Sequence, residues 1–262
     1  PRFQIDGDDA PVPGFYLPGA DSNGAFNYCS WLWEGSRIPT INNTGTITSI
    51  VNANKAAGFS TAIYKGDGNQ NATVGNGLDD NPSLIFIKRT DTANAWFVPV
   101  PTIGTNEFME LSDAASTTDV NLEYSQQTGV IKFDSAAPSA QMNANGGFYI
   151  MYSFADVPGI QKIGTYQGNG TSKTIYTTDD GTSSGSNGFQ PSFILIKVYD
   201  DIQNWYLFDS ARGASQYLRL DTNGQDASSA GALTSFNTDG FSIGNSGAIN
   251  TDTKNYIYLA IK

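Results

Sequence analysis

Short apolar segments alternate with clusters of Gly, Asn and Asp along most of the chain, above all after residue 58. No helix-length window keeps an apolar period of about 3.6 residues, and strong helix formers such as Glu and Lys are scarce, so the pattern predicts strands and almost no helix. Turn residues bound each apolar segment, as expected for short strands. The strands predicted in the first half are Phe59–Lys65, Ala72–Gly75, Leu84–Arg89, Trp96–Val100, Phe108–Leu111, Val120–Tyr124, Val130–Phe133 and Phe148–Phe154.

Two of these segments carry more specific expectations. Leu84–Arg89 is a continuous apolar run between Pro82 and Asp91, which is typical of a central strand covered on both faces. Phe59–Lys65 and Ala72–Gly75 flank a glycine-rich turn. We expect its glycines to supply positive φ angles in a tight hairpin between these two strands.

Three patterns occur twice in the same order, which indicates an internal repeat. Their offsets are 102, 109 and 107 residues, as a duplication followed by loop insertions would leave them. The first is Tyr-x-Gly-x-Gly, the second an apolar strand followed by a Trp, and the third a closing aromatic strand. The pairs are Tyr64–Gly68 with Tyr166–Gly170, Pro82–Lys88 with Pro191–Lys197 ahead of Trp96 and Trp205, and Phe148–Ala155 with Asn255–Lys262.

The repeat predicts an all-β fold of two tandem β-sandwich, jelly-roll-like repeats with an irregular N-terminal β extension. We place the extension at residues 1–45, the first sandwich at 46–157 and the second at 158–262. Before residue 59 the pattern is weaker, with candidate strands at Phe3–Ile5, Phe15–Leu17, Phe26–Trp33 and Thr46–Val51. Phe26–Trp33 is either the last strand of a preceding, truncated copy or an added strand that covers an edge of the first sandwich.

Charge and composition exclude several classes of function. The net charge is −11, and the 14 basic residues are scattered singly, so we expect no nucleic-acid partner. No apolar run is as long as a membrane span. Cys29 is the only cysteine, which predicts a small buried side chain and no intrachain disulfide. Because the chain begins at Pro1, we expect a processed protein or a piece of a longer one.

The chain contains no histidine, which removes Ser-His-Asp and Cys-His catalysis and His-ligated metal sites. A glycosidase instead needs two carboxylates that flank a sugar ring. The glutamates available are Glu34, Glu107, Glu110 and Glu123, and none of them recurs in the second repeat. We therefore interpret them as exposed residues on polar strand faces and predict no enzyme, no catalytic residue and no cofactor.

Acidic clusters raise the question of a metal site. They occur at Asp6–Asp9, Asp79–Asp80, Asp179–Gly181 and Asp200–Asp201. None has the spacing of a calcium-binding loop, and Asp side chains commonly form turns through hydrogen bonds to nearby backbone, so we predict no metal site.

Aromatic side chains raise the question of sugar binding, since they stack on sugar rings. Trp31, Trp33, Trp96 and Trp205 are the candidates. Trp96 and Trp205 occupy equivalent positions in the two repeats, beside apolar strands, which favours a core role over a sugar platform.

The repeat pattern resembles that of structural proteins of tailed phages that infect marine bacteria. The resemblance covers residues from about 40 to 262 and rests on Thr44–Asn54 leading into Ala57–Ser60, on Tyr64–Gly68 and on Pro82–Lys88. The chain departs from the family where Gly75–Leu78 reads Gly-Asn-Gly-Leu instead of Gly-His-Gly-Leu, and where Ala95 replaces the Asn of an Asn-Trp pair.

This resemblance implies a non-enzymatic structural protein on a virion surface, in a tail, a fibre or a head decoration, with a role in host adhesion. The implied partners are neighbouring virion proteins, copies of itself in a homo-oligomer, with a trimer favoured, and a cell-surface glycan. Comparison of the two repeats, independently of the resemblance, places any function in loops that differ between them, such as Asp179–Gly188 and Asp113–Asp119. Two alternatives stay open: a carbohydrate-binding module of a secreted or cell-surface protein, and a His-free glycan hydrolase or lyase.

Overall fold

The computed structural model describes residues 2–3, 31–36, 38–104, 107–112, 117–118, 124–133, 141–222 and 226–262. The chain divides into two compact units, Pro1–Glu34 and Gly35–Lys262. In the first unit, β1 (Arg2–Phe3) pairs antiparallel with β2 (Trp31–Leu32). Cys29 and the candidate strand Phe15–Leu17 lie outside the described residues.

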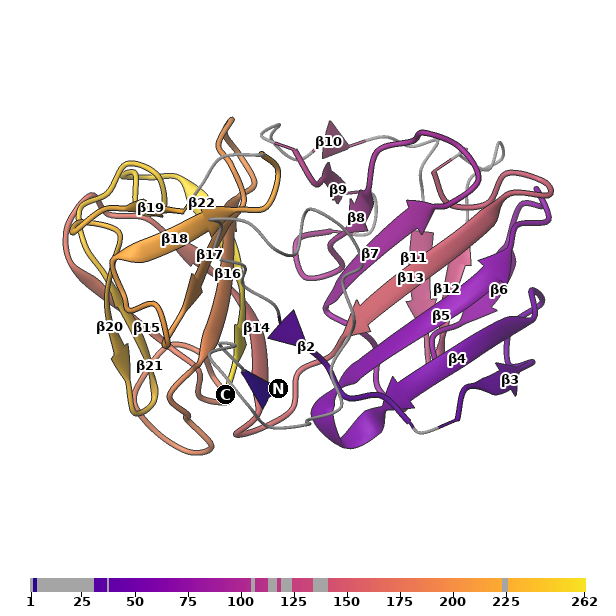
Figure 1. The fold of residues 1–262 in the computed structure, drawn as a ribbon, viewed down its shortest axis with the longest axis horizontal. Coiled ribbons are helices and arrows are strands. Elements are labelled where there is room, and N and C mark those ends of the chain that lie inside the picture. Colours follow the sequence, from indigo (N-terminus) through magenta and orange to yellow (C-terminus); the bar gives the residue numbers. More distant parts are fainter. Residues whose placement is uncertain are drawn as a thin grey trace, which may run out of the picture. The chain divides into compact units, whose positions relative to one another are not determined.

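The first repeat consists of an eight-stranded and a three-stranded antiparallel sheet (Figure 1). The large sheet has the order β10-β9-β8-β7-β13-β5-β4-β3, and the small sheet has the order β11-β12-β6. A single 3₁₀ turn, η2 (Lys55–Ala57), joins β4 to β5. The strands are β3 (Thr40–Asn42), β4 (Ser49–Asn54), β5 (Phe59–Lys65), β6 (Ala72–Gly75), β7 (Leu84–Arg89), β8 (Phe97–Pro99), β9 (Glu107–Glu110), β10 (Thr117–Thr118), β11 (Tyr124–Gln127), β12 (Val130–Phe133) and β13 (Phe148–Phe154).

The second repeat has the same plan without β3 and β4. Its six-stranded sheet has the order β14-β22-β16-β17-β18-β19, and its small sheet has the order β15-β21-β20. The strands are β14 (Gln161–Gln167), β15 (Lys173–Tyr176), β16 (Phe193–Val198), β17 (Tyr206–Asp209), β18 (Gln216–Arg219), β19 (Ala227–Ser228), β20 (Leu233–Asn237), β21 (Gly240–Ile243) and β22 (Asn255–Ile261). Each of β5 to β13 therefore has one counterpart, in the same order, among β14 to β22.

Two separate apolar cores support this plan. One cluster takes buried side chains from both sheets of the first repeat, such as Val74 and Ile131 from the small sheet and Ile87 from the large one. The second cluster joins the two sheets of the second repeat, with Phe241 from the small sheet and Ile196 from the large one. The all-β fold of two tandem β-sandwiches is thus confirmed. No helix among the described residues is long and apolar enough to cross a membrane.

The glycine-rich turn after β5 differs from the predicted hairpin. β5 pairs with β4 and β13 in the large sheet, whereas β6 pairs with β12 in the small sheet. The turn is therefore a corner between two sheets. Gly68 has the expected positive φ of 72°, but Gly66 is needed for another reason, because a Cβ there would lie 2.4 Å from the carbonyl oxygen of Ala144. The second repeat repeats this corner with Gly170 at φ 66° and Gly168 against Thr251.

A buried tyrosine fixes each corner. The hydroxyl of Tyr64 donates to the carbonyl oxygen of Met142 at 2.7 Å, and Tyr166 donates to Ile249 at the same distance. Each ring stacks on a second tyrosine, at 5.1 Å for Tyr64 on Tyr149 and at 4.9 Å in the second repeat. Burial raises the pKa of Tyr64 well above its ordinary value, as does the neighbouring Tyr149. The hydroxyl therefore stays a donor at any ordinary pH.

A fully buried asparagine closes each corner. In the first repeat, Asn143 accepts from the backbone N–H of Asp67 at 3.0 Å and donates to the carboxylate of Asp67 at 3.0 Å and to the carbonyl oxygen of Asn69 at 3.2 Å. In the second, Asn250 accepts from the N–H of Asn169 at 2.9 Å. The loop before the last strand is thereby tied to the glycine corner in both repeats.

The two sandwiches also contact each other. Trp205 is 1% exposed and packs on Phe86 of the first repeat, with ring centroids 5.8 Å apart. Its indole N–H donates to the carbonyl oxygen of Glu110 at 3.0 Å. The equivalent Trp96 is half-buried and packs on Tyr152 of its own repeat. Trp205 is buried as expected, but it fills the contact between repeats and does not belong to the core cluster of its own sandwich.

We predict that Asn143→Ala lowers the free energy of unfolding by about 1–3 kcal/mol, because it leaves buried polar groups of the corner without partners. Asn250→Ala should act similarly in the second repeat. Asn145 is exposed and only two residues away, so Asn145→Ala should change stability by no more than about 0.5 kcal/mol. Urea unfolding measures the free-energy differences, provided that the dependence of the unfolding free energy on urea concentration is the same for each variant. Equal losses for the Asn143 and Asn145 variants would contradict the role given to Asn143.

We also predict unequal effects for the two equivalent tryptophans. Trp205→Phe removes the N–H that bonds Glu110 and should lower the free energy of unfolding by about 1–3 kcal/mol. Trp96→Phe should cost clearly less, since Trp96 is half-buried. The comparison uses urea midpoints of the two variants, and a larger loss for Trp96→Phe would show that Trp205 does not join the repeats.

Candidate functional site

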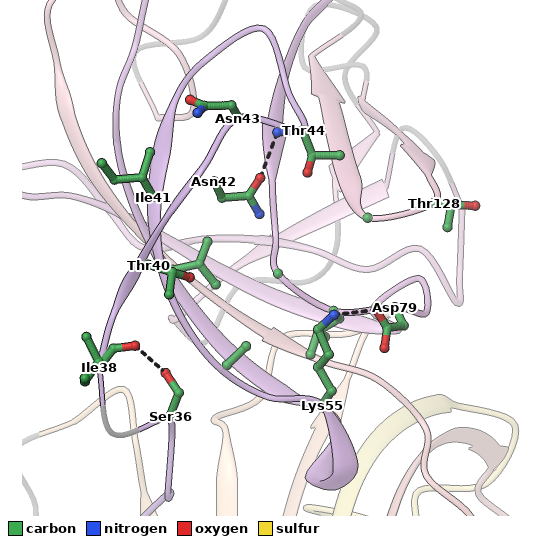
Figure 2. Close-up of a pocket in the computed structure, with 15 residues that line it drawn as sticks. Ser36, Ile38, Thr40, Ile41, Asn42, Asn43, Thr44, Lys55, Asp79 and Thr128 are labelled. Carbon is green, nitrogen blue, oxygen red and sulfur yellow. Dashed lines mark hydrogen bonds and ion pairs between the residues drawn. The ribbon is translucent and has the colours of Figure 1, made fainter.

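A groove of about 560 Å³ lies at one end of the first sandwich (Figure 2). A pocket of this size can hold a small ligand. Its walls come from three places: the β3–β4 hairpin with the segment before it, the loop that follows β6, and the turn between β11 and β12. The lining residues are Ser36, Ile38, Thr40, Ile41, Asn42, Asn43, Thr44, Val51, Ala53, Lys55, Gly77, Leu78, Asp79, Thr128 and Gly129.

The hairpin loop forms one wall because it crosses from the large sheet to the edge of the small one. Ile47 bridges in parallel to Val74 of β6, and its N–H donates to the carbonyl oxygen of Thr73 at 2.8 Å. Gly45 permits this approach, since a Cβ there would lie 2.4 Å from the same carbonyl oxygen. The side chain of Asn42 lies over Gly75 and accepts from the N–H of Thr44 at 2.8 Å.

The loop after β6 forms the opposite wall. Buried Asn76 donates its backbone N–H to Gly129 at 3.0 Å, and its side-chain oxygen accepts from the N–H of Leu78 at 2.8 Å. Gly77, between Asn76 and Leu78, adopts a φ of 81°. It passes so close to Val51 that a Cβ on Gly77 would lie 2.1 Å from the Cγ1 atom of Val51. The loop is thus held to both the β11–β12 turn and the hairpin.

Polar groups surround an aliphatic lining. Lys55 and Asp79 form an ion pair of 2.5 Å on one side, and Asn42, Thr44 and Thr128 provide amide and hydroxyl groups elsewhere (Figure 2). The hydroxyl of Ser36 donates to the carbonyl oxygen of Ile38 at 3.0 Å. Hydroxyls, amides and a single ion pair above aliphatic side chains suit a neutral, hydroxyl-rich ligand better than a strongly charged one.

The groove does not combine two carboxylates. Asp79 is the one acid among its lining residues, whereas glycoside hydrolysis requires two that face each other. Of the glutamates considered above, Glu34 is exposed, Glu107 and Glu110 are half-buried on β9 outside the groove, and Glu123 lies outside the described residues. The structure does not bring them together there.

The acidic clusters are bonded within the chain. The carboxylate of Asp180 accepts from the backbone N–H groups of Thr182 and Ser183 at 2.9 and 3.2 Å, and these bonds lower the pKa of Asp180 far below its usual range. Asp200 accepts from Asn255, and Asp201 pairs with Lys254 at 3.0 Å. Within the described residues no group of three or more metal-ligating side chains comes together. Asp6–Asp9 lies outside those residues.

The remaining candidates are not part of the groove. Trp31 and Trp33 are half-buried, and neither lines it. The loop Asp179–Gly188 belongs to the second repeat, and most of Asp113–Asp119 lies outside the described residues. Sequence reasoning missed the groove because its β3–β4 wall has no copy in the second repeat. The candidate strand Thr46–Val51 covers part of this wall, but its pattern does not show that the loop before β4 crosses to the edge of the small sheet.

Comparison with known proteins places the chain beside one family. A model of the family described as "Domain of unknown function (DUF7483)" matches residues 13–262. No curated protein and no solved structure matches the chain.

Two glycines with the same φ provide a test of the groove wall. Gly77 and Gly146 both have φ 81°, but a Cβ at Gly146 would meet nothing within 4 Å. Gly146→Ala should therefore lose only about 1 kcal/mol for the left-handed backbone. Gly77→Ala should lose about 1–3 kcal/mol more, because Val51 has to move. Chemical denaturation compares the two, and equal losses would show that the wall is not tightly packed at Gly77.

Proposed function

We propose that this chain, which belongs to the family described as a domain of unknown function (DUF7483), is a non-enzymatic structural module on a virion surface. It would stand in a tail, a fibre or a head decoration and present loops to the outside. The resemblance of residues from about 40 to 262 to repeats of phage structural proteins supports this most directly.

The division between scaffold and variable parts is in keeping with such a role. The glycine corners, stacked tyrosines and buried asparagines occur in both repeats and hold the sandwiches. The β3–β4 hairpin and the loops, which differ between repeats, are the parts free to acquire a specific contact. Rigid sandwiches joined in tandem are suited to carrying such contacts on a particle surface.

A second candidate function, carbohydrate binding, is favoured by the groove of the first sandwich. Its hydroxyl and amide groups and its Lys55–Asp79 pair suit a glycan, and a glycan-binding groove on a virion surface would serve adhesion to the host. The same groove supports a non-enzymatic role, since its lining includes a single acid and the chain has no histidine. Binding at many copies on one particle would raise a weak affinity by avidity.

The virion assignment is tested by fractionating a culture that expresses the native gene. We expect the chain to sediment with virus particles in a density gradient, and antibodies against it to label the particle surface in electron micrographs. A chain that stays with the cells, or in the particle-free medium, would contradict the proposal.

The glycan site is tested by two neighbouring aspartates. Asp79→Asn should weaken the binding of an arrayed glycan by roughly tenfold, the effect of about 1.4 kcal/mol, because it breaks the ion pair with Lys55. Asp80 is exposed and does not line the groove, so Asp80→Asn should leave the affinity unchanged. If both variants bind like the unmodified chain, or if no arrayed glycan binds at all, the groove is not a glycan site.

A further inference from the structure

Four isoleucines stand in one row across four neighbouring strands of the eight-stranded sheet. Ile41 of β3 lies opposite Ile50 of β4, Ile50 opposite Ile63 of β5, and Ile63 opposite Ile150 of β13. Their chain neighbours, such as Val51, point into the core, so the row faces outward. We call these four residues the isoleucine row.

The isoleucine row is unusually exposed for aliphatic side chains placed side by side. Ile41, which also borders the groove, is 72% exposed, Ile63 is 49% and Ile50 is 46%, whereas Ile150 is half-buried. Single exposed apolar side chains are normal on a protein surface, but a contiguous set of them marks an interaction surface.

The second repeat shows that the sandwich does not require this row. Thr165 stands where Ile63 stands in the first repeat, and β14 has no neighbours equivalent to β3 and β4. Ile257, the counterpart of Ile150, is 2% exposed. The exposed part of the row, formed by Ile41, Ile50 and Ile63, is therefore specific to the first repeat, and the hairpin that forms a wall of the groove supplies two of these three residues.

The isoleucine row continues a face that already packs against a sandwich. The next row of outward-facing side chains lies two residues further along β13 than Ile150. It includes Tyr152 of β13 and Phe86 of β7, which lie opposite each other. Phe86 packs on Trp205 of the second repeat. One outward sheet face thus contacts a β-sandwich at β7 and leaves its isoleucines exposed over β5, β4 and β3.

The outward face that carries the isoleucine row has no acidic side chain, which bears on the kind of partner it can approach. The side chains that point outward from β3, β4, β5 and β13 include no acid, and Lys65 is their one charged member, although the whole chain has a net charge of −11. A face free of acids can approach a second, equally acidic copy without bringing like charges into close contact.

We propose that the isoleucine row is the contact surface between two copies of this chain, packed row against row about a two-fold axis. When an outward sheet face with one apolar row packs on its own copy about a two-fold axis, apolar side chains meet apolar side chains, as they do where two sheets pack face to face. This contact goes beyond the proposed virion role and does not depend on it. It also differs from the trimer that the resemblance favours.

The test uses two substitutions to the residue that the second repeat carries at the Ile63 position. We expect the full chain to be a dimer in sedimentation equilibrium, and Ile50→Thr with Ile63→Thr to raise the dimer dissociation constant at least tenfold. Ile202→Thr is the matched control, because Ile202 is 66% exposed and lies outside the row. Near-ultraviolet circular dichroism checks that all three proteins are folded.

Every other outcome overturns the proposal. An unmodified chain that stays monomeric up to roughly 100 µM has no contact of useful strength between copies. A dimer that survives the double substitution uses another surface, and a trimer excludes two-fold pairing of the row. Equal weakening by Ile202→Thr would indicate non-specific association of exposed isoleucines.

Discussion

Each sandwich depends on the hydrogen bonds that hold the chain where it passes from the large sheet to the small one. A buried tyrosine hydroxyl, that of Tyr64 or Tyr166, bonds a carbonyl group of the loop before the last strand. Asn143 or Asn250 ties that loop back to the glycine corner. The single cysteine allows no intrachain disulfide, and the described residues of the two sandwiches form no α-helix, so the corner is where side-chain hydrogen bonds hold the two sheets of each sandwich together around the apolar core.

The two repeats differ mainly where the first one adds structure. The β3–β4 hairpin extends the large sheet, closes against β6 through Ile47, and forms a wall of the groove. It also supplies Ile41 and Ile50 to the isoleucine row. Because the hairpin lies outside the duplicated strands, it can change without disturbing the corner. Both proposed contact surfaces of the first repeat include residues of this one hairpin.

Much of the fold could be predicted because apolar runs and turn residues are local signals. Phe59–Lys65, Leu84–Arg89 and Phe148–Phe154 form strands with the predicted bounds. The predicted hairpin between β5 and β6 was wrong, because the residues of a turn do not tell which sheet the next strand joins. Trp205 was expected in a core, but its equivalence to Trp96 in the sequence does not tell which surface covers the side chain.

Asn143 and Asn250 were detectable from the sequence, since they are 107 residues apart like the closing strands. The comparison of the copies had considered aromatic and glycine positions and not these polar residues. The groove could not be predicted, because it forms from segments brought together only by the fold.

The connection between the sandwiches is short and is itself hydrogen-bonded to the first repeat. The side chain of Gln161, at the start of β14, is 2% exposed and donates to the carbonyl oxygens of Gly58 and Ala155 at 3.1 and 2.7 Å. Trp205 holds the same pair of repeats at a second place. A flexible joint would let each repeat search for its own contact, and much of the gain from linking them would be lost as entropy. Two anchors instead keep the loops of one repeat at a fixed distance from those of the other, so a partner that contacted both repeats would need sites at a matching spacing.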